Sequence, residues 1–297
     1  MGSDRIAIAS RATRRILDRC RVVRDHKFRL KDHDPADTGG LGLDRRDADI
    51  LLEEGVARLA ALQEQFFAAK HGAVLCCLQA MDTAGKDGTI KHVMSGVNPQ
   101  GVRVTSFKVP SAEERAHDFL WRMNRALPMR GEIGIFNRSH YEDVLVTRVH
   151  PERLDRTKPP GVKFWTRRLQ AIAAWEEHLA REGTAVIKFF LHISRAEQKR
   201  RLLARLNNAD KHWKFSDADL AERQYWDDYQ HAYEQAITAT ASKHAPWFVV
   251  PADHKWFARL VVVGALIEVL EGADRSLPAP DLTAIAAARA ALEAEAD

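Results

Sequence analysis

The residues from Ala80 to Thr89 combine the side chains and the backbone needed to hold a phosphate group. The segment reads Ala-Met-Asp-Thr-Ala-Gly-Lys-Asp-Gly-Thr and follows an apolar run from Ala73 to Leu78. This order predicts a buried strand, a tight loop and a helix, in which backbone N–H groups and the positive helix end face one point. Lys86 adds a mobile ammonium group. The sequence therefore predicts a phosphate-binding loop.

The spacing of this loop matches the pattern GxxxxGK[ST] at Gly85 and Lys86. Ala80 stands in place of the first glycine, and Asp87 in place of the serine or threonine. These departures leave open an ordinary strand-to-helix turn in which Lys86 is a solvated surface charge. Asp82 favours the phosphate loop, because a carboxylate there would repel an anion unless a divalent cation such as Mg²⁺ lay between the two.

The composition predicts one large α/β domain with appendages. A chain of 297 residues with 45% hydrophobic residues can bury a sizeable core. The net charge of +4 and the pI of about 9.0 favour a polyanionic partner. Three cysteines without a CxxC or HExxH pattern predict neither a disulfide framework nor a zinc site. The chain shows no signal peptide and no apolar run of about 18 residues, so we expect a cytoplasmic protein that does not span a membrane.

Alternation of strands and helices predicts a doubly wound parallel sheet of five strands. After the strand that precedes the loop, strands are expected at 102–107, 132–136, 185–193 and 247–250. Helices are expected at 44–72, 110–127, 163–181 and 256–270. Ser111 and Glu114 form the capping-box pattern at the start of the second of these helices.

Three segments stand apart from this core. Residues 1–31 carry ten Lys or Arg, typical of a solvated arm, or alternatively of a segment that attracts an anionic substrate or a neighbouring subunit. Between the fourth and fifth strands, 194–245 predicts a helical pair with cations around its turn, either a mobile lid at about 200–235 or a hairpin with surface cations. We divide the chain into an extension at 1–44, a domain at 45–272 that contains this lid, and a helical tail at 273–297 that docks on the outside or on another subunit.

The third strand runs directly into the polar segment from Asn137 to Asp143. In a parallel sheet, ligands bind at the carboxyl edge, so Asp82, Lys86, Asn137 and Arg138 are expected to meet there, with Arg148 as a further cation. Such a set suits phosphoryl transfer, which needs aligned anions, a bridging metal and cations where charge spreads.

Two other chemistries are disfavoured. A phosphohistidine intermediate, for example at His140, would need a nucleophile–base pair that the sequence does not show. A nucleic-acid binder would need an RNA-recognition or helix-turn-helix signature, and neither is visible.

Three stretches, in this order, resemble the second family of polyphosphate kinases: LQAMDTAGKDGTIKHVMSGVNPQG (78–101), GEIGIFNRSHYEDVLVTRVHP (131–151) and ADKHWKFSDADLAERQYWDDYQHAYE (209–234). The similarity extends from about Lys27 to Leu270. The Asn-Arg-Ser-His-Tyr-Glu-Asp form of the second stretch resembles the third subclass, which phosphorylates both AMP and ADP from inorganic polyphosphate.

The resemblance implies a P-loop kinase core with a helical lid, dependence on Mg²⁺ with Mn²⁺ as the alternative, a cytoplasmic location, and a homo-oligomer, either a dimer or a tetramer. The implied partners are polyphosphate and the nucleotides AMP, ADP and ATP, without nucleic acid or membrane. The runner-up functions are an ATP-dependent nucleoside monophosphate kinase and a non-catalytic nucleotide- or polyphosphate-binding regulator.

The resemblance also implies residue roles. Asp82 would act on the metal and the acceptor phosphate, while Lys86 and Arg138 would grip the transferred phosphoryl group. Asn137 stands where much of the family has Asp, which leaves its place as a second metal ligand open, and Asp87 stands where other subclasses often have Gly. The residues expected at nucleotide or polyphosphate are Ala84, Gly85, Asp87, Gly88, Thr89, Lys91, Asn137, Glu142, Asp143, Arg148, Arg201, Arg205, Lys211 and Lys214.

Acceptance of both AMP and ADP requires the α-phosphate of AMP to occupy the place of the β-phosphate of ADP. The nucleoside of AMP then lies one phosphate deeper, where Glu142 or Asp143 could accept a hydroxyl hydrogen bond that ADP does not make. The alternative is that both acids merely stabilise the start of the following helix, where acidic residues are common.

We predict that Lys86→Ala lowers kcat on the order of 100-fold while the protein still folds, because this cation bonds most strongly to the transition state. Steady-state kinetics with a thermal unfolding control would measure it. An unchanged kcat would mean that the loop is structural.

Overall fold

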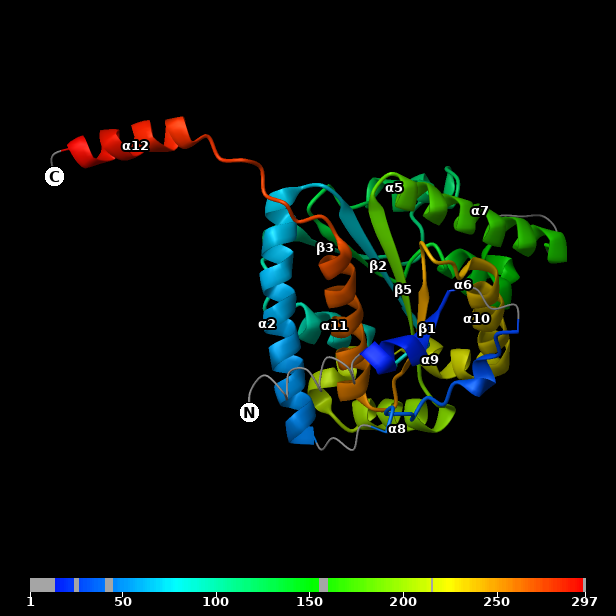
Figure 1. Ribbon diagram of the computed structural model, residues 1–297. Coiled ribbons are helices and arrows are strands. Elements are labelled where there is room, and N and C mark those ends of the chain that lie inside the picture. The colour runs from blue at the N-terminus through cyan, green and yellow to red at the C-terminus, as the bar shows by residue number, and fades with distance from the viewer. Residues whose placement is uncertain (1–13, 24–26, 41–44, 155–159, 215, 296–297) are drawn as a thin grey trace.

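The protein is a six-stranded sheet covered by helices on both faces, with one further helix projecting from the body (Figure 1). The computed structural model describes residues 14–23, 27–40, 45–154, 160–214 and 216–295. The expectations for residues 1–13, for position 44 and for the side chain of Lys214 lie outside the described part.

The strand order is β1-β6-β5-β2-β4-β3. The strands are β1 (Arg21–Val22), β2 (Ala73–Ala80), β3 (Val102–Ser106), β4 (Ile133–Asn137), β5 (Thr184–His192) and β6 (Trp247–Pro251). The strands β2 to β6 pair in parallel, which confirms the predicted five-stranded parallel sheet. The antiparallel strand β1 at the edge was not predicted, since two residues are too short to show alternation.

Helices α2, α3 and α11 lie on one face of the sheet, and α6, α7 and α10 lie on the other (Figure 1). The α-helices are α2 (Arg45–Ala69), α3 (Lys86–Val93), α4 (Ala112–Arg115), α5 (Trp121–Arg125), α6 (Glu142–Val149), α7 (Val162–Arg181), α8 (Arg195–Leu206), α9 (Asp217–Glu222), α10 (Trp226–Thr240), α11 (Lys255–Gly272) and α12 (Leu282–Ala294). The stretch predicted as a lid is thus helical, comprising α8, α9 and the first part of α10.

The strand β2 runs through the middle of the core and is buried along its whole length. Cys76 and Leu78 contribute to the face covered by α3 and α11, whereas Leu75 and Cys77 pack with Trp175 of α7. Burial on both faces explains why this strand reads as a continuous apolar run rather than as an alternating one. Burial also raises the pKa of the Cys76 and Cys77 thiols, as expected of inert core residues.

Two sequence-based expectations about local structure are wrong. The helix expected at 110–127 is divided into α4 and α5, because the Asp118 side chain accepts from the backbone N–H of Leu120 and starts a new turn. The capping box at Ser111 and Glu114 is confirmed. The reading of the basic arm as solvated fails for its second half, where Ile16 and Leu17 are buried in the core.

The end of α2 also differs from expectation. The helix expected to extend to residue 72 stops at Ala69, and Lys70 takes the left-handed conformation (φ 55°) that ends it. Gly72 serves a different purpose, because a Cβ atom there would lie 2.8 Å from the carbonyl oxygen of Gly183. The close approach brings the starts of β2 and β5 together.

Helix α12 stands away from the body (Figure 1). Its Leu282, Ile285 and Leu292 side chains are exposed. Among the described residues, no helix combines the length and the apolar character needed to cross a membrane.

Candidate active site

The phosphate loop lies between β2 and α3, as predicted. Gly85 precedes α3 with φ 108°, in the left-handed region that favours glycine, and Thr83 also has a positive φ of 63°. The backbone N–H of Thr89 donates to the carbonyl oxygen of Gly85 at 2.9 Å. The strand therefore turns sharply into the helix, so that the first N–H groups of α3 point at the carboxyl edge of the sheet.

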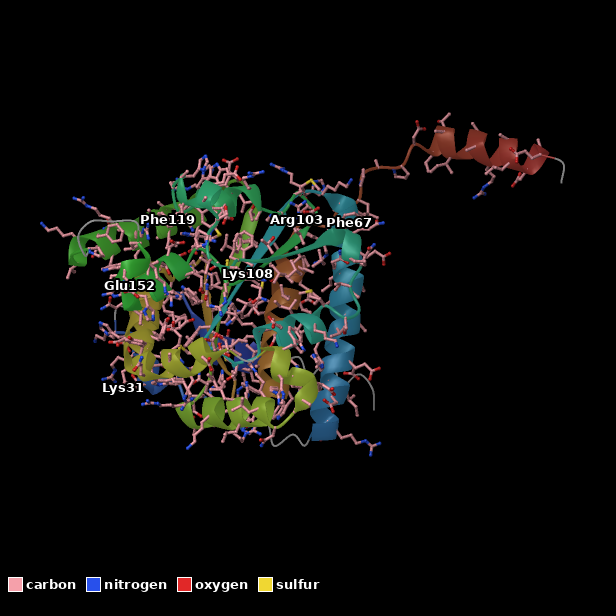
Figure 2. The ribbon with its side chains drawn as sticks, turned by 180° about the vertical axis from the view of Figure 1, so that it is seen from behind. Lys31, Phe67, Arg103, Lys108, Phe119 and Glu152 are labelled. Atoms are coloured by element: carbon pink, nitrogen blue, oxygen red, sulfur yellow. The ribbon has the colours of Figure 1, made fainter. Side chains whose placement is uncertain are left out.

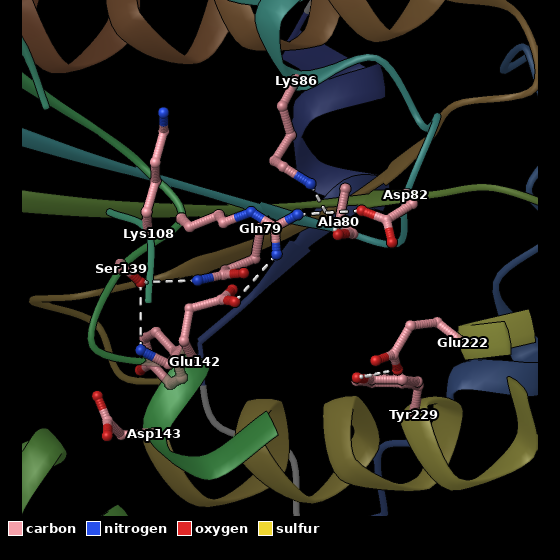
Figure 3. Close-up of polar contacts among 12 residues, drawn as sticks. Gln79, Ala80, Asp82, Lys86, Lys108, Ser139, Glu142, Asp143, Glu222 and Tyr229 are labelled. Carbon is pink, nitrogen blue, oxygen red and sulfur yellow. Dashed lines mark hydrogen bonds and ion pairs between the residues drawn. The ribbon is translucent and has the colours of Figure 1, made fainter. Parts of the chain in front are cut away.

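Lys86 is buried, with 9% of its surface exposed. Its Nζ donates to the carbonyl oxygen of Ala80 at 2.9 Å, folding the side chain back over the loop (Figure 3). Burial lowers the pKa of Lys86, and the nearby Arg138 lowers it further, while Asp82 opposes both. The alternative of a solvated surface lysine is therefore wrong.

Arg138 lies between two carboxylates that come from different elements. Its Nη2 donates to Asp82 Oδ1 at 3.0 Å and its Nη1 to Glu142 Oε2 at 3.1 Å. Burial lowers the pKa of Arg138, but the charges of Glu142 and Asp82 outweigh burial and raise it. Arg138 has a positive φ of 64°, and its backbone N–H bonds to Leu78 of the neighbouring strand β2. The pairing of β2 with β4 thus brings Asp82, Lys86 and Arg138 together.

Asn137 contacts the other unusual residue of the loop. Its Nδ2 donates to Asp87 Oδ1 at 2.9 Å, and Ser106 Oγ lies 3.4 Å away. Asn137 and Asp87, the two residues that the resemblance singled out, are therefore in direct contact. The amide oxygen of Asn137 is the atom that remains for a metal or a donor group.

The two acids that start α6 point in different directions (Figure 3). Glu142 faces Arg138, and with the Gln79 amide oriented to satisfy both its atoms, Gln79 donates to Glu142 Oε1 at 2.9 Å. Asp143 lies 3.8 Å from Arg122 and 3.7 Å from Arg168. Burial raises the pKa of Asp143, although these two cations act to lower it. Of the pair, Glu142 belongs to the cluster around Arg138, whereas Asp143 joins α6 to its neighbours.

Side chains of helix α8 donate hydrogen bonds to the backbone of the phosphate loop. The Arg201 guanidinium donates to the carbonyl oxygens of Thr83 (3.2 Å) and Ala84 (2.8 Å), and to that of Ala252 (2.5 Å) after β6. Gln198 Nε2 donates to the carbonyl oxygen of Asp82 at 3.1 Å. Arg201 was expected as a cation of the lid, and its attachment to the loop backbone was not foreseen.

The remaining predicted cations lie around this centre rather than in it. Arg205 pairs with Asp219 of α9 at 2.7 Å. Lys211, on the 3₁₀ helix η4 (Ala209–Lys214), and Lys91 on α3 are exposed. The Arg148 guanidinium lies 6.0 Å from the ring centroid of Trp165, outside the cluster of Asp82, Arg138 and Glu142.

The sequence analysis did not identify two further candidate functional residues. Lys255 begins α11 just after β6, and its pKa is lowered by burial and by the surrounding cations Arg201, Lys211, Arg259 and Arg200. Lys108 follows β3 at the same edge and is exposed (Figure 2, Figure 3). Both follow directly after a parallel strand, so the carboxyl-edge rule would have identified them.

A carboxylate joins α9 to the body of the protein. Glu222 accepts hydrogen bonds from Tyr229 (2.8 Å), Arg153 (2.9 Å) and His150 Nε2 (2.9 Å). Figure 3 shows Glu222 and Tyr229 on the opposite side of the view from Glu142. The helical stretch after β5 is therefore attached on one side through Arg201 and on the other through Glu222.

The donor atoms present fit a metal ion held jointly with phosphate. No cluster of three or more His, Cys, Asp or Glu side chains suited to a metal occurs in the described ranges. Mg²⁺ is usually bound by one or two carboxylates together with substrate phosphates and water rather than by a complete protein cage. Asp82, whose Oδ1 already contacts Arg138, supplies such a carboxylate at the loop.

We predict that Asn137→Asp raises the pKa of one carboxylate at this site, because it places a second acid next to Asp87. The expected result is a loss of kcat/KM at pH 7 of about tenfold, equivalent to 1.4 kcal/mol. Adding Asp87→Gly should recover most of the loss, as measured by pH profiles of the single and double variants. Additive losses in the double variant would contradict the coupling.

Comparison with known proteins agrees with the geometry. The model of the family "Polyphosphate kinase 2 (PPK2)" matches residues 42–278. The chain is 52% identical over 233 residues to an ADP-polyphosphate phosphotransferase of Rhodopseudomonas palustris, covering 77% of this chain and 81% of the relative. It is 47% identical over 265 residues to an AMP/ADP-polyphosphate phosphotransferase of Meiothermus ruber, covering 89% and 97%.

A crystal structure of polyphosphate kinase 2 from Arthrobacter aurescens has the same fold. It superposes with a TM-score of 0.85 at 44% identity, covering 93% of this chain and 95% of the other. The family match spans strands β2 to β6, the phosphate loop and all helices from α2 to α11. The chain therefore belongs to the polyphosphate kinase 2 family.

Proposed function

We propose that this protein transfers a phosphoryl group reversibly between inorganic polyphosphate and adenine nucleotides, converting AMP to ADP and ADP to ATP, with Mg²⁺ or alternatively Mn²⁺. The observation that carries the proposal is the meeting of Lys86, Asp82 and Arg138 at one point of the phosphate loop. Membership of the polyphosphate kinase 2 family supports the reaction class.

The residue roles that we propose are supported by the geometry of the site. The Lys86 ammonium and the Arg138 guanidinium donate to oxygens of the protein itself, which phosphate oxygens replace in this proposal. When substrate binds, both cations move these hydrogen bonds to the phosphoryl group, where charge spreads in the transition state. Asp82 and the Asn137 amide oxygen would hold the metal, which would neutralise phosphate charge. Backbone N–H groups from Ala84 to Thr89 hold the phosphate at the start of α3.

A track of cations supports a polyanionic donor. Lys255 lies among Arg200, Lys211 and Arg259, and Arg201 connects this group to the phosphate loop. Such a concentration of positive charge, close enough to lower the pKa of Lys255, suits a chain of phosphates better than a single nucleotide. Arg205 and Arg148 extend the positive field, and Lys108 adds a cation from the end of β3.

The choice of acceptor depends on Glu142 in this proposal. Glu142 lies beside Arg138, and 17% of its side-chain surface is exposed. It can therefore accept a ribose hydroxyl from the more deeply placed AMP, whereas Asp143 is engaged by Arg122 and Arg168. The relative from Meiothermus ruber, named as an AMP/ADP-polyphosphate phosphotransferase, supports the use of both acceptors.

The remaining proposals concern organisation. We propose that the stretch at about 200–235 closes over bound substrate as a lid, that the protein acts in the cytoplasm without nucleic acid or membrane, and that it forms a dimer or a tetramer. The exposed apolar side chains of α12 support the last of these, since a short isolated helix is marginally stable in water. The division into 1–44, 45–272 and 273–297 is part of the same proposal.

One assay separates this function from an ATP-dependent nucleoside monophosphate kinase and from a regulator. Purified protein with Mg²⁺ and AMP receives either long-chain polyphosphate or ATP as the only other phosphate source. We expect ADP and then ATP to form with polyphosphate, as resolved by chromatography. Product with ATP alone would support the monophosphate kinase, and binding without turnover would support the regulator.

The donor track predicts a steep salt dependence. A polyanion bound across several cations releases condensed counterions, so its apparent affinity should fall more steeply with salt than that of AMP. Lys255→Ala should reduce the slope of log affinity for polyphosphate against log salt by about 0.7 to 0.9. The matched control is Arg130→Ala, which removes a cation before β4 at the opposite edge of the sheet. Equal slopes for polyphosphate and AMP in the parent would contradict an extended track.

A further inference from the structure

A buried ionic group lies beneath the loop that joins β4 to α6. Glu176 of α7 and Lys188 of β5 are both fully buried, and Lys188 Nζ donates to Glu176 Oε2. Lys188 also donates to the carbonyl oxygen of Thr240 at 2.9 Å. Desolvation of two charges is costly, and hydrophobic pairs of similar volume often replace such pairs without loss of stability. Stability alone therefore does not explain why the core contains these charges.

The second oxygen of Glu176 holds two consecutive residues of that loop. His140 Nε2 lies 3.2 Å from Glu176 Oε1, and the Tyr141 hydroxyl lies 2.8 Å from it. The other ring nitrogen of His140 has no hydrogen-bond partner in the described structure, and burial lowers the pKa of His140. We therefore assign a neutral His140 with its proton on Nε2, donating to Glu176. His140 is also fully buried, which disfavours a phosphohistidine intermediate on its ring.

Lys188 keeps Glu176 in its charged form. Burial alone would raise the pKa of Glu176, but Lys188 and His140 outweigh burial and lower it. The Tyr141 ring packs against Trp247 of β6 with ring centroids 4.7 Å apart, and its hydroxyl also lies 2.7 Å from Thr240 Oγ1 of α10. The ionised carboxylate thus joins the loop to α7, α10 and the two strands β5 and β6.

The residues that Glu176 holds stand directly between the two that face the substrate. Arg138 precedes Ser139, His140 and Tyr141, and Glu142 follows them. Arg138 has a left-handed backbone (φ 64°), a conformation that surrounding contacts must maintain. A loop fixed at His140 and Tyr141 holds the Arg138 and Glu142 side chains at the separation that their 3.1 Å ion pair requires.

We propose that Glu176, paired with Lys188, is a positioning residue that holds Arg138 and Glu142 in place for phosphoryl transfer. This rests on the proposed function, because a fixed Arg138 lowers the activation free energy only where it stabilises the transition state of phosphoryl transfer. Glu176 does not touch the substrate. It acts through the hydrogen bonds of His140 and Tyr141.

Two double variants isolate the positioning role from stability. Glu176→Gln with Lys188→Met retains an acceptor oxygen for His140 and Tyr141, whereas Glu176→Leu with Lys188→Met removes it. Both remove the same two charges, so neither leaves an unpaired buried ion. The single variant Glu132→Gln changes another buried carboxylate, just before β4 at its amino end, and serves as the control.

We expect the Gln double variant and the Glu132→Gln control to keep kcat within about threefold of the parent. The Leu double variant should lose about 10- to 100-fold in kcat with little change in KM for AMP, because misplacement of a catalytic group by about 1 Å costs on that order. Thermal unfolding would be measured alongside. Equal kcat values for the two double variants, with the Leu variant folded, would overturn the proposal. If the Leu variant does not fold, Tyr141→Phe provides the test, and a kcat equal to that of the parent would overturn it.

A mutant cycle that combines the Leu double variant with Arg138→Ala tests whether Glu176 affects kcat through Arg138. If Glu176 acts through Arg138, the Leu double variant should lower the residual rate of Arg138→Ala by less than about twofold, since coupled residues are not additive. Full additivity would assign Glu176 a purely structural role. The parent enzyme separates the two levels of inference: no transfer from polyphosphate by the parent refutes the proposed function, whereas an active parent with equal double variants refutes only the positioning role.

Discussion

The site depends on balancing the charges of several cations that lie close together around the phosphate loop. Lys86, Arg138 and Arg201 lie close to one another around one loop. Their mutual repulsion would destabilise this arrangement if no oxygen atoms balanced the three positive charges. Each is compensated by oxygens of the protein itself: a carbonyl for Lys86, two carboxylates for Arg138, and several carbonyls with Glu197 for Arg201. The internal oxygens of Lys86 and Arg138 are the ones that substrate phosphates can replace.

The topology of the sheet brings these groups together. The strand β2 has β4 on one side and β5 on the other, so the phosphate loop faces the loop after β4 directly. Helices α8 and α11 begin at the same carboxyl edge, after β5 and β6, and contribute Arg201 and Lys255. Side chains from four strand ends thus meet at one place, although they are separated by more than a hundred residues in the chain.

Much of this arrangement could be predicted from the sequence. The apolar run before Gly85 and Lys86 identified β2 and the phosphate loop, and the rule for parallel sheets placed Arg138 beside Asp82. These inferences succeed because they depend on local periodicity and on the common direction of parallel strands. Lys255 and Lys108 obey the same rule and were overlooked.

Other features lie beyond pattern-based inference. The directions of Glu142 and Asp143 depend on which cations lie nearby, and Arg122 and Arg168 come from distant helices. The buried pair of Glu176 and Lys188 also escapes prediction, because a glutamate in an amphipathic helix and a lysine in a strand each read as surface residues. Only the packing of α7 on β5 shows that both are inside.

The central claim is that Arg138, whose guanidinium group donates to both Asp82 and Glu142, stabilises the phosphoryl group during transfer. The most direct measurement is kcat for Arg138→Lys at saturating polyphosphate, nucleotide and Mg²⁺. Lysine keeps the charge but loses the two separate N–H groups that contact the two carboxylates. The account predicts a fall in kcat of at least about tenfold with an unchanged melting temperature, the tenfold loss corresponding to about 1.4 kcal/mol of transition-state stabilisation. A kcat equal to that of the parent would contradict it.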